Sequence, residues 1–180
     1  MDRKKIFPML KGVLVLAAIA LVCGLLLGFF NILTYVDPLQ STLDGFKSDS
    51  GAEGEFEMIY GTEKGDAVAS GEGSVVYYAR SSDGVHAFLT EGSSRYGEVQ
   101  LYIYIREGSI YKIVLKSFTD DFGGNLTQDF FSQFYGKDLS ALDAMSGDTV
   151  SNATYSSSAA QKAVDAAAEY YLSQGGEGNE

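Results

Sequence analysis

Residues 12–36 contain no charged side chain, and this apolar run limits what the chain can fold into. A helix of about 20 such residues is long enough to cross the hydrocarbon layer of a membrane. The segment before it is basic overall and consists of four cations against one acid: Arg3, Lys4, Lys5, Lys11 and Asp2. Basic flanks stay in the cytoplasm. We therefore expect residues 1–36 to form a cytoplasmic basic end and a single anchor in the cell membrane, followed by an extracytoplasmic domain.

Two other uses of an apolar N-terminal run are less consistent with these residues. A cleaved signal peptide has a shorter apolar core, and no small-x-small cleavage site follows Phe30. A lipoprotein carries a small residue before its acylated cysteine, whereas Val22 precedes Cys23. The sequence thus favours an uncleaved anchor.

Composition excludes several classes of function. The chain has 180 residues and a formal net charge of -11, so it lacks the basic surface that nucleic-acid binding requires. Its one cysteine lies in the apolar run and its one histidine, His86, lies in an expected strand. Neither a His/Cys metal site nor a Ser-His-Asp triad can be assembled from them, and no Gly-rich phosphate loop follows a strand. Any redox chemistry has to come from a cofactor.

The sequence after the apolar run predicts an α+β domain over residues 55–174. Residues 37–54 are rich in Asp, Ser and Gly, and we expect a linker or juxtamembrane segment with a short helix. Residues 175–180 are expected to be a disordered acidic tail. The expected fold is an antiparallel sheet flanked by helices, and the single transmembrane helix precedes it.

Alternating apolar residues over Val99–Arg106 give the clearest predicted strand, and Glu107-Gly108 predicts a hairpin to the next one. Other extended runs are expected at Glu55–Tyr60, Val68–Arg80 and Val85–Glu91, with a loop at Gly92–Tyr96. Helices are expected at Gln128–Tyr135, Leu139–Met145 and from the serines after Tyr155 to about Leu172. Phe130, Phe131 and Phe134 should face the core.

The stretch Asp148–Ser157 leads into an alanine-rich amphipathic segment. Ser156, Ser157 or Ser158 can cap the expected helix. One face carries Ala159, Ala160, Ala163, Val164, Ala167, Ala168 and Tyr171. The free N–H groups and positive dipole end of such a helix favour a phosphate. Thr154, two residues before the first of these serines, can hold a phosphate-bearing group covalently.

The order D-x-x-S-x-A-T, carried here by Asp148, Ser151, Ala153 and Thr154, resembles the flavinylation motif of FMN-binding domains. That family includes the G subunit of the Rnf complex and the C subunit of the sodium-pumping NADH:quinone oxidoreductase. The resemblance implies that a flavin transferase takes FMN from FAD and esterifies its phosphate to Thr154. Ser156 and Ser157 match the hydroxyl pair that follows the motif, and Asn152 stands where the family has glycine. Asparagine is the residue that best tolerates the left-handed backbone after glycine.

The resemblance also assigns roles. Asp148 is expected to serve recognition or geometry during flavinylation, and Ser151, Ser156 and Ser157 to contact the phosphate. In the loop after the hairpin, Thr119, Gly123 and Gly124 match a threonine and glycines that approach the flavin, although the family's glutamate and proline are absent. A turn rich in Gly and Asp accounts for this loop equally well.

The motif region is open to two further interpretations. The stretch Asp148–Ser157 is also consistent with a simple Ser/Thr-rich turn that caps a surface helix. The triplets Asn152-Ala153-Thr154 and Asn125-Leu126-Thr127 have the form of N-glycosylation acceptors. The membrane anchor and the strands upstream favour FMN.

The sequence therefore predicts an electron-transfer flavoprotein with no independent catalytic site. By resemblance it is a G-type subunit of an Rnf-like ion-translocating ferredoxin:NAD oxidoreductase complex, with the other subunits and a maturing flavin transferase as partners. The alternatives are a stand-alone extracellular electron carrier and a non-redox, membrane-anchored binding or assembly module.

Overall fold

The computed structural model describes residues 3–61, 67–70, 72–119, 121–139, 148–151 and 153–175. It divides into two units, residues 1–37 and 38–180. The first consists of α1 (Arg3–Thr34), whose side chains from Lys11 onward are exposed. The described part of the chain contains one candidate membrane span, which begins at Lys11 and includes an 18-residue stretch with a mean hydropathy of 2.9.

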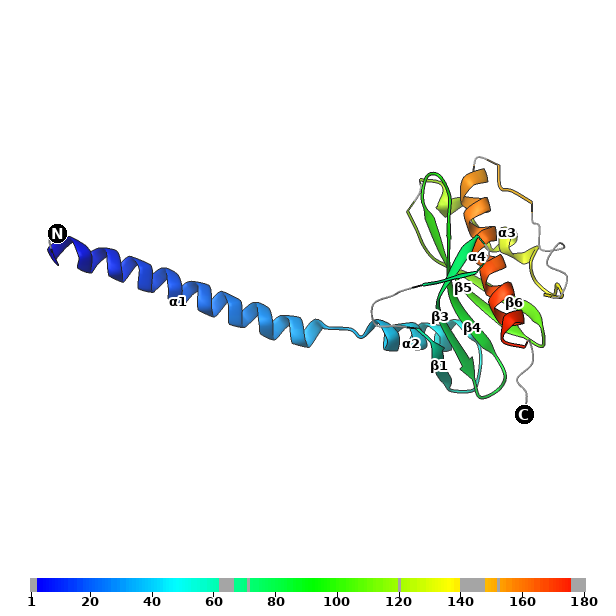
Figure 1. Cartoon of the computed structure of the whole chain (residues 1–180), viewed down its shortest axis with the longest axis horizontal. Helices are drawn as coiled ribbons and strands as arrows, with labels where there is room; N and C mark the ends of the chain where they lie inside the picture. Colours follow the sequence, from blue (N-terminus) through cyan, green and yellow to red (C-terminus); the bar gives the residue numbers. More distant parts are fainter. Residues whose placement is uncertain are drawn as a thin grey trace. The chain divides into compact units, whose positions relative to one another are not determined.

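The second unit is built on a six-stranded antiparallel sheet (Figure 1). The strands run in the order β1-β3-β4-β5-β6, and β2 also pairs with β3. Their bounds are β1 Phe56–Tyr60, β2 Val68–Ser70, β3 Gly73–Ser81, β4 His86–Ser93, β5 Glu98–Arg106 and β6 Ser109–Phe118. The helices of this unit are α2 Pro38–Ser50, η1 Gly123–Asn125 (3-10), α3 Gln128–Ser132 and α4 Thr154–Ser173. The expected α+β class is confirmed.

The hairpin expected at Glu107-Gly108 is confirmed. Arg106 pairs with Ser109, and the two residues between them have positive φ angles of 51° and 71°. Such a turn has the twist that joins two antiparallel strands without splaying them.

Two strand boundaries differ from expectation. Val68–Arg80 is not one extended run, because β2 and β3 pair with each other, Val68 opposite Val75 and Ser70 opposite Gly73. The glycines at 71 and 73 are the local signal for that reversal. Gly92 and Ser93 belong to β4 rather than to the expected loop, which shrinks to residues 94–97.

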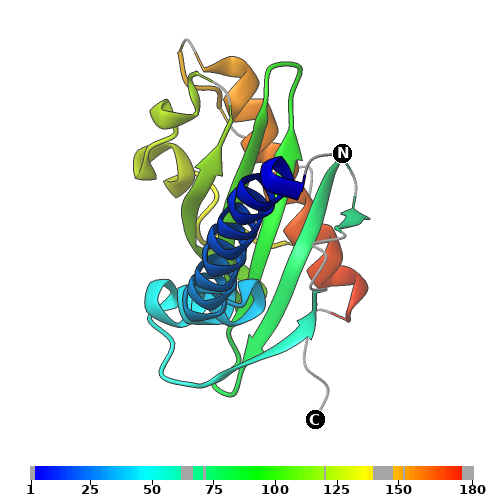
Figure 2. The same ribbon diagram turned by 90° about the vertical axis from the view of Figure 1, so that its left-hand side faces the viewer.

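Each face of the sheet is covered by a helix (Figure 2). On one face, α4 packs its alanines against Phe88, Leu101 and Ile103. All residues expected on the apolar side of this helix are buried, as are Phe130, Phe131 and Phe134. The expected helix Gln128–Tyr135 ends at Ser132, and residues 133–135 form turns. Of the further helix expected at Leu139–Met145, all but Leu139 lies outside the described residues.

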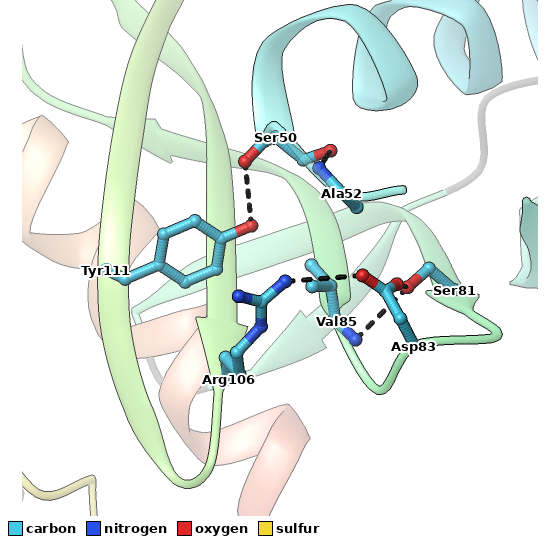
Figure 3. A network of polar contacts seen from close by, with 7 residues as sticks. All are labelled: Ser50, Ala52, Ser81, Asp83, Val85, Arg106 and Tyr111. Carbon is cyan, nitrogen blue, oxygen red and sulfur yellow. Dashed lines mark hydrogen bonds and ion pairs between the residues drawn. The ribbon is translucent and has the colours of Figure 1, made fainter. Parts of the chain in front are cut away.

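On the other face, α2 packs Phe46 against the sheet. The Phe46 ring is fully buried and its centroid lies 4.9 Å from that of Tyr102. Figure 3 shows how the end of α2 is attached: the Tyr111 hydroxyl donates to the carbonyl of Ser50 at 3.0 Å. Nearby, Arg106 forms an ion pair of 3.3 Å with Asp83. The short helix expected after Asp37 is thus present, and it packs on the domain rather than forming a free linker.

The backbone of α4 approaches the sheet closely where Gly73 of β3 pairs with Gly92 of β4. A Cβ at Gly92 would overlap the carbonyl oxygen of Ala159 and lie 2.8 Å from the amide nitrogen of Ala163. A Cβ at Gly73 would overlap the carbonyl oxygen of Lys162. Glycine is therefore required at both sheet positions for this contact.

Replacing Gly92 by alanine should destabilise the domain by about 3 kcal/mol, because the methyl group cannot fit without displacing α4. Urea unfolding of residues 38–180 would measure this, since all the described core residues lie in that range. The matched control is Gly124→Ala, whose Cβ would lie at an ordinary 3.6 Å from Phe118. Equal stability of the two variants would contradict the close contact.

Asp165 on α4 should make stability depend on pH. Burial, with Glu169 and Glu72 nearby, raises the pKa of its carboxyl to about 6. The folded state therefore binds a proton that the unfolded state releases from about pH 4 upward, and stability falls as pH rises to 6. Burial lowers the pKa of His86 to about 4. The contribution of His86 to stability therefore rises with pH over the same range, opposite to that of Asp165.

Comparison of Asp165→Asn with the wild type removes the contribution of His86, which both proteins share. The stability advantage of the variant should grow by about 1–2 kcal/mol between pH 4 and pH 7. Urea unfolding at a series of pH values measures it. An advantage that does not change with pH would show that Asp165 titrates normally in the folded protein.

Candidate functional site

The helix α4 begins at Thr154, earlier than expected. Ala153 is the N-cap residue and provides no side-chain cap, so the predicted cap by Ser156, Ser157 or Ser158 is wrong. Ser156 and Ser157 instead lie in the first turn on the buried side, which extends the alanine face by one turn. Thr154 is therefore the first helical residue, and its side chain is exposed.

Ser157 fixes the chain that enters the helix. Its hydroxyl oxygen accepts a hydrogen bond from the amide of Val150 at 3.0 Å. The amide of Ser157 donates to the carbonyl of Ala153 at 2.8 Å, and the amide of Ala153 donates to the carbonyl of Val150 at 3.0 Å. Ser157 thus binds the backbone of the motif, and this fold-back sets the position of Thr154.

Asp148 is held through its backbone. Its amide donates to Oε1 of Gln133 at 2.6 Å, and its carbonyl accepts from Nε2 of the same side chain at 3.4 Å. Gln133, in the turn after α3, is a positioning residue that the sequence did not reveal. The Asp148 side chain is exposed, as is Ser151, and Asn152 lies outside the described residues.

A cavity of about 440 Å³ opens beside Thr154. Three segments far apart in sequence form it: the β4–β5 hairpin tip, the loop after β6 and the beginning of α4, which Figures 1 and 2 show gathered at one end of the sheet. The lining residues are Tyr96, Thr119, Asp121, Phe122, Ala153, Thr154, Tyr155 and Ser156. The two stretches that the sequence singled out, the motif and the Thr119 loop, therefore meet in one cavity.

Thr119 contributes a hydroxyl in a defined orientation. Its oxygen accepts a hydrogen bond from the amide of Glu98 at 2.8 Å, and its own amide donates to the carbonyl of Glu98 at 3.0 Å. These bonds continue the β5–β6 pairing by one residue. Because the oxygen accepts from the backbone, the hydroxyl proton can be donated to a ligand in the cavity.

The two glycines of this loop that were expected to approach the flavin lie outside the cavity wall. Gly123 is buried, and a Cβ there would overlap the ring of Phe118, so packing requires a glycine at this position. Gly124 is exposed. Neither belongs to the residues that line the cavity, and nor do Asp148, Ser151 and Ser157.

Aromatic side chains form much of the cavity wall. Tyr96, Phe122 and Tyr155 are 60%, 53% and 51% exposed. The rings of Tyr96 and Tyr155 meet edge to face, with centroids 4.6 Å apart. A cavity that combines aromatic rings with several polar groups is typical of a cofactor or small-molecule site. The sequence does not reveal Tyr96, because a polar loop gives no sign of which side chain turns inward.

The electrostatics of the cavity suit one negative charge rather than several. The first turn of α4 contains no acidic residue, so its N–H groups and dipole favour an anion at Thr154. The carboxylate of Asp121 on the lining opposes further negative charge. A phosphate diester, with one charge, meets both conditions better than a free phosphate with two.

Replacing Ser157 by alanine should destabilise the domain by about 1–2 kcal/mol, because the amide of Val150 loses its acceptor. Ser158→Ala is the matched control, since Ser158 is the next residue and is exposed. Thermal or urea unfolding distinguishes the two. A loss in Ser157→Ala no larger than in Ser158→Ala would contradict the role of the hydroxyl in holding the motif.

No protein-family model matches the sequence, and a search of curated proteins finds no match. In the described ranges, no group of three or more His, Cys, Asp and Glu side chains is placed to hold a metal ion. The function therefore has to be inferred from the geometry of the cavity and the chemistry of its lining.

Proposed function

We propose that this protein is a membrane-anchored electron-transfer flavoprotein that carries FMN esterified to Thr154. One observation carries the proposal: an exposed threonine at the first residue of a 20-residue helix lies in the wall of a cavity of about 440 Å³ that also contains three aromatic side chains. The threonine supplies a point of attachment, the helix start stabilises a phosphate, and the cavity accommodates a large planar group.

Attachment would be a phosphoryl transfer in which FAD is the donor. Oγ1 of Thr154 loses its proton and forms a bond to the phosphorus of the FMN half, while the pyrophosphate bond breaks and AMP leaves. The product is a diester. Outside the cytoplasm, such a bond prevents loss of the cofactor by dissociation, which is the physical advantage of a covalent link in an extracytoplasmic domain.

The chain's own residues would bind and orient the group, whose ring, once bound, accepts and donates one or two electrons. The helix start holds the phosphate. The Thr119 hydroxyl donates a hydrogen bond into the cavity, and the aromatic wall shields one part of the ring from water. The protein's task is to place and tune the flavin; we assign no residue to independent catalysis.

The proposed setting is the extracytoplasmic side of the cell membrane. The helix α1 supports anchoring, and the cations at Arg3, Lys4, Lys5 and Lys11 favour a cytoplasmic N-terminus. We propose a G-type subunit of an Rnf-like complex, with the other subunits as redox partners and a flavin transferase during maturation. Co-purification of the full chain from native membranes separates this from a stand-alone carrier, which would leave the membrane without other redox subunits.

Intact mass spectrometry tests the attachment. The full chain, co-produced with an active flavin transferase and exported, should gain the mass of one esterified FMN. Thr154→Ser should retain the gain because it keeps a hydroxyl, and Thr154→Ala should lose it completely.

Thr149→Ala is the control, because Thr149 is an exposed threonine of the same stretch that does not line the cavity. It should load as the wild type does. No mass gain in the wild type beside a loaded positive substrate of the transferase would contradict the proposal and favour the non-redox module.

A further inference from the structure

The aromatic wall of the cavity comes from two elements that are far apart in the sequence. Tyr155 is the second residue of α4 and Tyr96 lies at the tip of the β4–β5 hairpin. We propose that Tyr96 and Tyr155 together form the subsite for the isoalloxazine ring of the flavin, with Tyr96 in direct contact with the ring. This rests on the proposed function, because the ring reaches the cavity only through the ester at Thr154.

Tyr155 brings the wall close to the point of attachment. It follows Thr154 directly in the first turn of the helix, so its backbone position relative to the ester is fixed by helical geometry. The ring centroids of Tyr155 and Tyr96 are 4.6 Å apart and their planes are inclined by 78°. A planar group tethered at Thr154 therefore meets an aromatic surface at the start of the helix.

The hairpin tip places Tyr96 firmly although its side chain is 60% exposed. Ser93 pairs with Glu98 at the base of the tip, and the amide of Ser94 donates to the carbonyl of Gly97 at 2.8 Å. The amide of Tyr96 donates to the hydroxyl of Ser94 at 3.3 Å. The backbone is thus ordered by local hydrogen bonds. The ring packs on Tyr155, its centroid lies 5.9 Å from the guanidinium carbon of Arg95, and its exposed part can contact a ligand without refolding of the tip.

Polar and aromatic groups of the lining match the two ends of FMN. The phosphate and ribityl hydroxyls are polar, and Thr119 contributes a hydroxyl to the lining. The tricyclic ring is flat and aromatic, and such rings pack best on other aromatic rings in offset or edge-to-face geometry. With the phosphate fixed at Thr154, the aromatic wall is the part of the cavity suited to the ring.

Flavin fluorescence tests the contact with Tyr96. A tyrosine in van der Waals contact with a photo-excited flavin quenches it, because one electron passes from the phenol to the ring and then returns. The test uses the full chain in detergent, loaded with FMN by the transferase. Tyr155 is a second oxidisable phenol of the same subsite, so every protein compared carries Tyr155→Phe. In this background Tyr96→Phe keeps the aromatic surface and removes the remaining phenol, so the fluorescence yield per bound FMN should rise several-fold.

A second variant separates contact from shielding. Tyr96→Leu should raise the yield as well and should also make the ring more accessible to acrylamide, a neutral quencher, whereas Tyr96→Phe should leave that accessibility unchanged. Tyr35→Phe is the control, since Tyr35 is an exposed tyrosine outside the domain. Intact mass establishes that every variant carries one FMN before the yields are compared.

The experiment distinguishes a failure of the Tyr96 contact from a failure of the FMN attachment. A loaded Tyr96→Phe protein with the same yield as Tyr35→Phe would overturn the contact between Tyr96 and the ring while leaving the FMN ester intact. A wild-type protein that gains no FMN would overturn the proposed function and this subsite with it.

Discussion

The contact between the backbone of α4 and the paired glycines Gly73 and Gly92 is the constraint on which the site depends. A helix packed at side-chain distance could slide or rotate on the sheet. Here the sheet has no Cβ at either glycine and the helix presents the backbone of Ala159, Lys162 and Ala163 to it, so dense packing fixes the helix in one position. That position places the beginning of α4 beside the β4–β5 hairpin tip and the loop after β6, and the cavity lies where these three segments meet.

Elements with strong local signals were predictable from the sequence. Strict alternation over Val99–Arg106 defined β5, and the alanine face of α4 has the helical period that burial requires. The division of Val68–Arg80 into β2 and β3 was not predictable from periodicity, because both strands favour extended backbone and only two glycines mark the reversal. The serines misled the prediction of the helix start: their hydroxyls suit a cap, but Ser157 uses its hydroxyl to bind the amide of Val150 from inside the helix.

The candidate site was predictable in part. Thr154 and Thr119 stood out from separate stretches, and the structure places both on one cavity. Gly123 stood out for its residue type, but it is needed for close packing against Phe118. Gln133 and Tyr96 could not be found, because their roles arise only when a turn after α3 and a hairpin tip are brought to the motif by the tertiary fold.

The proposed modification is a flavin diester on one hydroxyl, and peptide mapping of the protein purified from native membranes tests it most directly. Cleavage after Lys137 and Lys162 releases residues 138–162, which contain the whole motif. We expect this peptide to carry FMN, and we expect its fragment ions to assign the flavin to Thr154. An unmodified peptide, or a flavin assigned to another hydroxyl of the stretch, would contradict the claim.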